Sequence, residues 1–244
     1  MRLGDGKDIL AAISGGRLLD VATGGGLFIV YVRKRLKDYH EIVGIDSDES
    51  AAARFAKRCG DDPRIRFEPM DARDLRFPDA TFDTVAIGNA LCEFKEPSAV
   101  LSEMFRVLRG GGHLILAEAY RDQHSEPTMT HVLFHDWWVA VEGLAGSQHQ
   151  PFRPRADLIR SLRELGLLDL RLRDVPSETS DPREPALLAE IDDLTDRNLI
   201  LARGNPELKA RGEALRRRMH DVGFQECTDL LAVGRKRRRV ARTA

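Results

Sequence analysis

Cysteine is scarce in this sequence. Cys59, Cys92 and Cys227 are the three copies in 244 residues, and they stand far apart along the chain. An odd number of scattered cysteines matches neither a disulfide framework nor the paired spacing of a zinc finger. We therefore expect three reduced thiols, as in a cytosolic protein.

Long apolar runs and an excess of one charge are missing too. No stretch approaches the roughly 20 apolar residues of a membrane-spanning helix, and Met1–Asp5 does not begin a signal peptide. The 38 basic and 39 acidic residues nearly cancel, so no overall field attracts nucleic acid or a membrane surface. These absences predict a cytoplasmic protein without a membrane partner. With 42% hydrophobic residues, the chain is most simply one domain, 1–244, with insertions.

The most informative stretch that is present is Arg17–Gly26, which reads Arg-Leu-Leu-Asp-Val-Ala-Thr-Gly-Gly-Gly. A short apolar run, then glycines, then periodic apolar residues predict a strand, a tight loop and a helix. This is the first half of a βαβ unit, with a ligand loop at the carboxyl end of the strand. Glycines in such a loop let a ligand lie against the bare backbone.

Two ligands compete for this loop, a dinucleotide and S-adenosylmethionine. The dinucleotide fingerprint requires a small residue three positions after Gly26, where this chain has Ile29. No Lys-Ser or Lys-Thr pair follows the glycines, which excludes a Walker-type phosphate loop. Asp20 would repel a pyrophosphate, whereas it suits a ligand that carries an ammonium and a sulfonium group. These residues therefore favour S-adenosylmethionine.

From about residue 16 to residue 120, the sequence resembles the class I S-adenosylmethionine-dependent methyltransferases. It is most similar to the small-molecule group that includes the ubiquinone/menaquinone biosynthesis methyltransferases, whose glycine motif often begins Leu-Asp-Val-Ala. The stretches Asp79–Asp83 and Arg106–Gly112 also resemble the family's pattern. Ala22 departs from it, because many members have a glycine there.

The resemblance implies a three-layer α/β fold with a mostly parallel seven-stranded sheet. The expected strand order is 3-2-1-4-5-7-6, with the last strand antiparallel and with helical insertions. It also implies that Asp71 and Ala72, after the third strand, bind adenine. Asp46 stands at the end of the second strand, at the distance from the glycines where an acid meets a ribose; the alternative is that it caps the following helix. The predicted cofactor-binding residues are Asp20, Ala22, Gly24, Gly26, Asp46, Asp71, Ala72 and Asn89.

Asn89 has two interpretations besides closing the cofactor pocket. It follows the fourth strand, so it could position the substrate, or it could be a turn asparagine without a chemical role.

Residues 121–152 contain most of the histidines and both tryptophans, Trp137 and Trp138. His131 and His135 are four residues apart and share one face of a helix. They could ligate a metal, serve as general base, or form a structural pair. No glutamate of a His-Glu-x-x-His motif lies between them, so we expect no metal and name both as candidate catalytic residues. The tryptophans either contact an apolar or planar acceptor or pack the inserted helix on the domain.

Two insertions, 121–152 and 184–218, are expected to cover the substrate, and residues 235–244 form a basic tail. The predicted function is transfer of a methyl group from S-adenosylmethionine to an oxygen, nitrogen or carbon nucleophile of a small molecule. One alternative is a non-catalytic protein that only binds the cofactor. Another is an RNA methyltransferase, which the Gly88–Leu91 sequence disfavours because it lacks the aromatic motif that stacks a flipped base.

Overall fold

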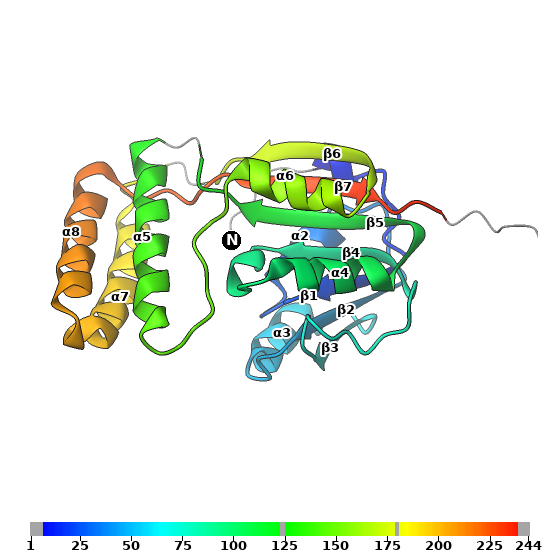
Figure 1. Cartoon of the computed structure of the whole chain (residues 1–244), viewed down its shortest axis with the longest axis horizontal. Coiled ribbons are helices and arrows are strands. Elements are labelled where there is room, and N and C mark those ends of the chain that lie inside the picture. Colours follow the sequence, from blue (N-terminus) through cyan, green and yellow to red (C-terminus); the bar gives the residue numbers. More distant parts are fainter. Residues whose placement is uncertain (1–6, 123–124, 179–180, 239–244) are drawn as a thin grey trace, which may run out of the picture.

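The chain folds around one seven-stranded sheet, and the computed structural model describes residues 7–122, 125–178 and 181–238 (Figure 1). The strand order is β3-β2-β1-β4-β5-β7-β6. Strands β1 to β5 pair in parallel, and β7 is antiparallel to both β5 and β6. The predicted topology is therefore confirmed. The strands are β1 Arg17–Val21, β2 Glu41–Asp46, β3 Ile65–Pro69, β4 Phe82–Gly88, β5 Leu108–Ala119, β6 Leu168–Val175 and β7 Asp229–Arg235.

Helices cover both faces of the sheet, which gives three layers (Figure 1). Side chains of α1, α2 and α3 pack on one face, against strand residues that include Leu18 and Leu231. Side chains of α4 and α6 pack on the other face, against Leu19 and Leu230. Because neighbouring strand residues point to opposite faces, the central strands need continuous apolar runs. These helices are α1 Lys7–Leu10, α2 Leu27–Arg33, α3 Ala51–Cys59, α4 Pro97–Val107 and α6 Arg155–Glu164.

Three longer helices form a separate bundle beyond one end of the sheet (Figure 1): α5 Glu126–Gly143, α7 Pro185–Leu201 and α8 Pro206–Val222. Trp137 of α5 lies fully buried among apolar side chains from all three helices. Its indole N–H donates to the carbonyl of Leu208 at 2.8 Å. Gly212 leaves room for the ring, since a Cβ there would lie 2.4 Å from it. Trp137 therefore has a packing role, but it packs α5 against α7 and α8 rather than on the sheet domain as the alternative expected.

No helix in the described part of the chain combines the length and the apolar character needed to cross a membrane.

Strand β5 begins at Leu108 and therefore includes the glycine-rich stretch 109–112. A register shift between β4 and β5 allows the glycine-rich stretch to join the ladder. Gly112 is needed there, because a Cβ would lie 2.6 Å from the carbonyl oxygen of Asp83.

The start of the expected basic tail belongs to the folded domain. Arg235 ends β7 and pairs with Asp169, with 2.6 Å between Nη2 and Oδ2. The ammonium group of Lys236 donates to the carbonyl of Leu108 at 2.7 Å, where α4 ends and β5 begins. Residues 239–244 of that expected tail lie outside the described residues.

Candidate functional site

A cavity of about 730 Å³ opens at the carboxyl ends of β1 to β4. Parallel strands of an open α/β sheet bring their loops together at this edge, which is where such folds bind ligands. The described residues that line it include most of the predicted cofactor set: Ala22, Gly24, Asp46, Asp71, Ala72 and Asn89. Asp20 and Gly26 are the two predicted residues that do not line the cavity.

The loop after β1 turns through three residues with positive φ. These are Ala22 at 52°, Gly24 at 49° and Gly26 at 79°. An alanine in this conformation costs about 1–2 kcal/mol, which explains why a glycine is common at this place in the family that the sequence resembles. A Cβ on Gly24 would meet nothing in the protein within 4 Å, whereas one on Gly26 would lie 2.8 Å from Cys59 Sγ. Gly24 therefore keeps space open for a ligand, and Gly26 lets α2 pack against α3.

Asp46 connects the ends of two neighbouring strands. Its Oδ2 accepts from the backbone N–H of Gly24 at 2.8 Å, and its Oδ1 accepts from the N–H of Asp48 at 2.9 Å. Each carboxylate oxygen can accept a second hydrogen bond, so Asp46 can still receive two hydroxyl groups from the cavity. Asp46 does not have the alternative capping role, because the N-cap of α3 is Ser50 and no side chain caps this helix end; Asp48 Oδ1 accepts from the N–H of Ser50 at 2.9 Å.

Asp20 lies beneath the loop as a buried carboxylate. Its Oδ2 accepts from the hydroxyl of Thr23 at 2.6 Å, while its Oδ1 has no hydrogen-bond partner among the described residues. Burial raises the pKa of Asp20 to about 7, and the nearby charge of Asp46 adds to that rise. A buried carboxylate with an unpartnered oxygen is costly by itself, and a cation above the loop would relieve that cost.

Asp71 is held by a neighbouring arginine. The Arg73 guanidinium donates from Nη2 to Oδ2 at 2.7 Å and from Nε to Oδ1 at 3.0 Å. These hydrogen bonds lower the pKa of Asp71. The pair is half exposed, so it contributes little stability and can open at small cost for the predicted contact with an adenine amino group. Ala72 is buried beside it and forms part of the cavity wall.

Asn89 separates this cavity from a second one of about 320 Å³, and both cavities include Asn89 and Glu93 in their lining. Its Oδ1 accepts from the N–H of Ala119 at 2.8 Å, and its amide group donates to Asp229 at 3.4 Å. Its φ of 49° is one that asparagine adopts more readily than most residues. Asn89 thus joins β4 to β5 and β7, in addition to facing the ligand space.

The second cavity is acidic and partly aromatic. Three carboxylates line it, and no lysine or arginine is among its described lining residues. Burial raises the pKa of Asp229, one of the three, to about 7. The full set is Asn89, Cys92, Glu93, Ala119, His131, His135, Trp138, His149, Phe152, Glu226, Cys227 and Asp229.

Both predicted catalytic histidines lie in this second cavity. His131 Nδ1 accepts from the backbone N–H of Cys227 at 2.9 Å. The His135 ring stacks on Phe152, with 3.6 Å between ring centroids and 14° between planes. Burial lowers the pKa of His135 to about 3, and the neighbouring His149 adds to this shift. His135 is therefore neutral near pH 7 and a weak base.

Sequence reasoning missed His149, which lies in the loop after α5. Its Nε2 lies 3.1 Å from His135 Nε2, and its Nδ1 lies 2.9 Å from Glu142 Oε2. The indole N–H of Trp138 donates to the other oxygen of Glu142 at 2.6 Å. Trp138 therefore fixes one carboxylate oxygen of Glu142, and the other oxygen orients the His149 ring. Helical periodicity could not find His149, because it does not belong to the helix.

The two expected insertions relate differently to this cavity. The segment 121–152 contributes His131, His135, Trp138 and His149 to the lining, together with Phe152 at its end. No described residue of 184–218 lines it. The helices α7 and α8 instead pack against the far side of α5.

Comparison with known proteins agrees with this geometry. Residues 19–116 match the family model described as a methyltransferase domain. Over 103 residues the chain is 40% identical to a demethylmenaquinone methyltransferase of Deinococcus radiodurans, and this segment is 42% of this chain and 42% of that one. Over 109 residues it is 37% identical to a phosphatidylethanolamine N-methyltransferase of Cereibacter sphaeroides, covering 43% of this chain and 52% of that one. The chain thus spans about half the length of these curated relatives.

Solved structures share the whole fold at low identity. A phosphoethanolamine N-methyltransferase of Haemonchus contortus in complex with S-adenosylmethionine superposes with a TM-score of 0.57 at 15% identity, over 95% of this chain and 51% of that one. The [4+2]-cyclase SpnF gives a TM-score of 0.62 at 24% identity, over 93% and 77%. The resemblance noted in the sequence is confirmed for the segment 19–116 and for the fold.

Proposed function

We propose, from the premise that residues 19–116 form a methyltransferase domain of the class I type, that this chain is an S-adenosylmethionine-dependent small-molecule methyltransferase. In this proposal the first cavity holds the cofactor and the second holds the acceptor. The supporting observation is that six predicted cofactor residues line one cavity, and that this cavity shares a wall with a second one containing polar side chains.

The first cavity fits the cofactor in shape and charge. The open space above Gly24 allows close approach of a ligand to the backbone. The free acceptor positions of Asp46 suit two ribose hydroxyls, and Asp20, which is buried and does not line the cavity, would favour a cationic ligand through its charge without contacting it. Buried Met70 and Ala72 offer apolar surface to a base.

When bound, S-adenosylmethionine supplies an activated methyl group that an oxygen, nitrogen or carbon nucleophile can displace directly. The residues of this chain then contribute mainly alignment and exclusion of water. Asn89 and Glu93, which line both cavities, stand where the two ligands would meet. His131 and His135 line the acceptor cavity, so we retain them as residues that contact the acceptor.

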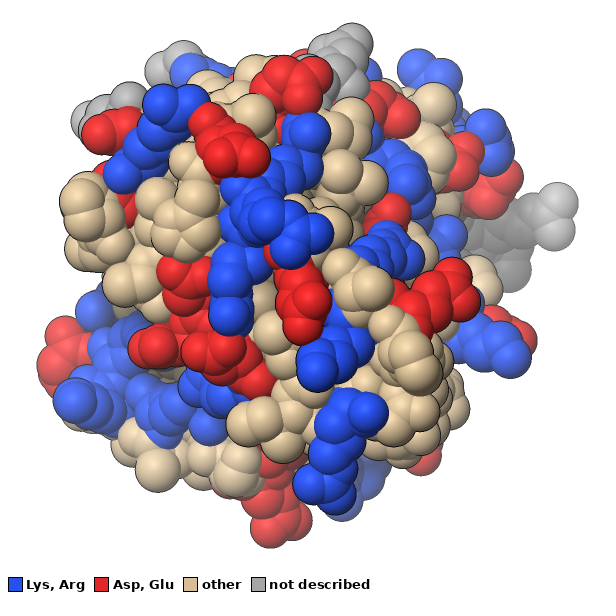
Figure 2. All heavy atoms as spheres, turned by 90° about the vertical axis from the view of Figure 1, so that its left-hand side faces the viewer, with Lys and Arg blue, Asp and Glu red and all other residues tan. Residues whose placement is uncertain are grey.

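A small acceptor is favoured over nucleic acid by the size of the second cavity and by the surface charge of the helical bundle. Figure 2 shows that lysine and arginine side chains are interspersed with aspartate and glutamate on this face. Some of them form ion pairs between α7 and α8, such as Arg216–Asp192 at 3.3 Å. A nucleic-acid surface would instead present a continuous basic area. A cytoplasmic location, inferred from the few cysteines and the absence of long apolar runs, is part of the same proposal.

Calorimetric titration of the chain with S-adenosylmethionine and with its demethylated product tests the proposal. We expect saturable binding of both, and release of demethylated cofactor when an acceptor from a metabolite panel is added. Absence of binding of either ligand at millimolar concentration would overturn the proposal. Binding of both without turnover of any acceptor would favour the non-catalytic alternative.

A further inference from the structure

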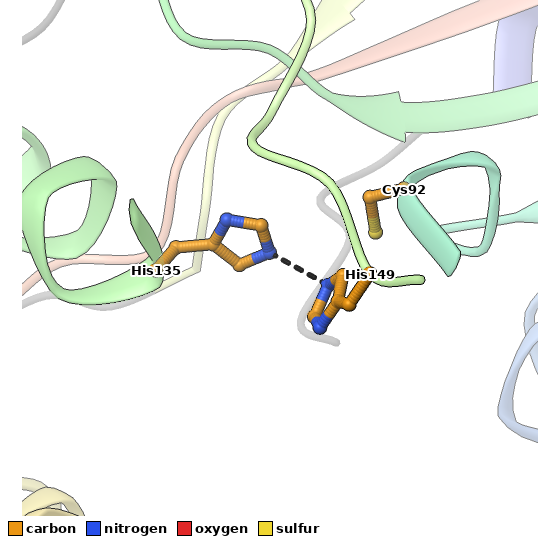
Figure 3. A group of neighbouring side chains, drawn as sticks. All are labelled: Cys92, His135 and His149. Atoms are coloured by element: carbon orange, nitrogen blue, oxygen red, sulfur yellow. Dashed lines mark hydrogen bonds between the residues drawn. The ribbon is translucent and has the colours of Figure 1, made fainter. Parts of the chain in front are cut away.

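Three side chains from separate segments point toward one another (Figure 3), and all three line the second cavity: Cys92, His135 and His149. Cys92 lies in the short 3-10 helix Leu91–Glu93, His135 in α5, and His149 in the loop that follows α5. One potential ligand atom from each lies within 4.8 Å of the other two. The two imidazole Nε2 atoms are 3.1 Å apart.

We propose, in place of the expectation of no metal, that Cys92, His135 and His149 form a binding site for a zinc ion in the wall of the acceptor cavity. Two imidazole nitrogens and a thiolate are a donor set that zinc prefers, and three protein ligands are the usual number where a fourth position remains open. Binding would release the Cys92 thiol proton to solvent, and the proton in the Nε2–Nε2 hydrogen bond would move to Nδ1 of His135, so that both Nε2 lone pairs face the metal.

The spacing of the donors matches a tetrahedral ion. Zinc–nitrogen bonds of about 2.0–2.1 Å place two nitrogen ligands about 3.3 Å apart, and a zinc–sulfur bond of about 2.3 Å places nitrogen and sulfur about 3.6 Å apart. The observed 3.1 Å between the two Nε2 atoms is close to the first value. The sulfur lies within 4.8 Å of one ring nitrogen of each histidine, so a shift of about 1 Å brings it to the second value.

One of the two histidines has the outer contact that metal sites use, whereas Nδ1 of His135 has no hydrogen-bond partner among the described residues. A ligating histidine usually donates its second ring N–H to a carboxylate, which fixes the tautomer with the lone pair toward the metal. His149 has this arrangement, since its Nδ1 lies 2.9 Å from Glu142 Oε2. Trp138 in turn holds Glu142 through the bond at 2.6 Å. The stacked Phe152 ring fixes the plane of His135.

The charge of the cavity supplies an independent argument. Glu93, Glu226 and Asp229 line it together with the cluster, and no lysine or arginine is among the described lining residues. Glu93 Oε1 lies 3.8 Å from His149 Nε2, at the edge of the proposed site. A divalent cation would balance these carboxylates.

The open coordination position of the ion would face the acceptor cavity. What binds at that position rests on the proposed function. A zinc-bound hydroxyl or thiol loses its proton near neutral pH, which makes it a nucleophile. We therefore assign acceptors with such a group as the substrate class of the metal-loaded protein. Metal binding itself does not depend on this assignment.

The test is a zinc titration of the full chain, with any histidine tag removed and the protein first stripped with a chelator. We expect one equivalent of zinc to survive desalting, measured by elemental analysis. The variants Cys92→Ser and His149→Ala should lose this equivalent. The matched controls Cys227→Ser and His131→Asn, which alter the same cavity outside the cluster, should keep it. Glu142→Gln should weaken zinc binding by about 10–100-fold, the usual effect of removing an outer carboxylate.

Cobalt substitution gives a readout that does not depend on the variants folding. The cobalt-loaded wild type should show a thiolate-to-cobalt charge-transfer band in the near ultraviolet. Absence of that band, absence of a stoichiometric equivalent of zinc, or equal zinc binding by Cys92→Ser and wild type would each overturn the site. Titration of the same samples with S-adenosylmethionine separates the two proposals: cofactor binding without zinc refutes only the metal site, and zinc binding without cofactor refutes only the methyltransferase.

Discussion

The carboxylate of Asp46 at the end of β2 accepts a hydrogen bond from the backbone N–H of Gly24, 2.8 Å away in the loop after β1. Twenty-two positions separate the two residues in the sequence. This bond fixes the glycine loop against the neighbouring strand, so the residue expected to hold the ribose also holds the loop that lies next to it. Binding and loop geometry are therefore coupled through Asp46.

Asp46→Ala should weaken S-adenosylmethionine binding by about 1–3 kcal/mol, the scale for losing hydrogen bonds to a charged group. Isothermal titration calorimetry measures it directly. Asp61→Ala is the control, because Asp61 pairs with Arg33 on the surface and does not line the cavity. Equal affinities of the Asp46 variant and wild type would contradict the assignment.

Gly24→Ala and Gly26→Ala should separate binding from stability. Both residues have positive φ, so either alanine costs about 1–2 kcal/mol of conformational strain. The methyl group at residue 24 enters empty space, and should abolish cofactor binding without a further loss of stability. At residue 26 it would lie 2.8 Å from Cys59 Sγ and 3.2 Å from Phe55, which should add about 1–3 kcal/mol of overpacking.

Urea denaturation and cofactor titration of the two glycine variants, run side by side, give the comparison. A Gly24→Ala protein that binds the cofactor like wild type would show that the ligand does not approach this part of the backbone.

Asp20 should make stability fall as the pH rises. Its folded-state pKa of about 7 is above the ordinary value of 3.8, so between these values the folded state binds more protons than the unfolded state. The contribution of Asp20 protonation to the free energy of unfolding is complete below about pH 4 and is lost as the pH rises past 7. At about 1.4 kcal/mol per pKa unit, this contribution is roughly 4 kcal/mol at most.

Asp20→Asn cannot titrate, so the free energy of unfolding of this variant should depend less on pH across the same window. Denaturation curves of both proteins between pH 4 and 8 measure the difference. Parallel pH profiles for the two proteins would contradict a raised pKa at Asp20.

The two adjacent tryptophans should respond differently to substitution. Trp137→Ala removes a fully buried ring and the partner of the Leu208 carbonyl, and should cost about 3–5 kcal/mol. Trp138 is only half-buried, so Trp138→Ala should cost about 1–2 kcal/mol, mainly through the lost bond to Glu142. Chemical denaturation measures both, and cofactor affinity should be unchanged in both. A larger loss for Trp138 would mean that α5 is held mainly from the cavity side.

The sequence by itself determined the fold class and most of the predicted residues that line the first cavity. An apolar run followed by a helix pattern indicates a parallel crossover, and the family resemblance implied the strand order. Gly24 and Asp46 could be predicted because they stand at strand ends, which parallel strands bring to one edge, and the family resemblance implied Asp71 and Ala72. These residues could be predicted from the sequence because their place relative to the strands can be read along the chain.

Only the tertiary structure decided which side chains meet in the second cavity. Cys92, His135 and His149 belong to three segments, and Cys92 has no neighbour in the sequence that would suggest a ligand set. Helical spacing grouped His131 with His135, whereas the packing of α5 against the loop after it placed His149 Nε2 beside His135 Nε2. The same packing places Trp137 in the core of the helical bundle and Trp138 in the lining of the second cavity. Local periodicity indicates which residues share one face of a helix. The residues that this face contacts depend on how distant segments pack, and that packing depends on the whole chain.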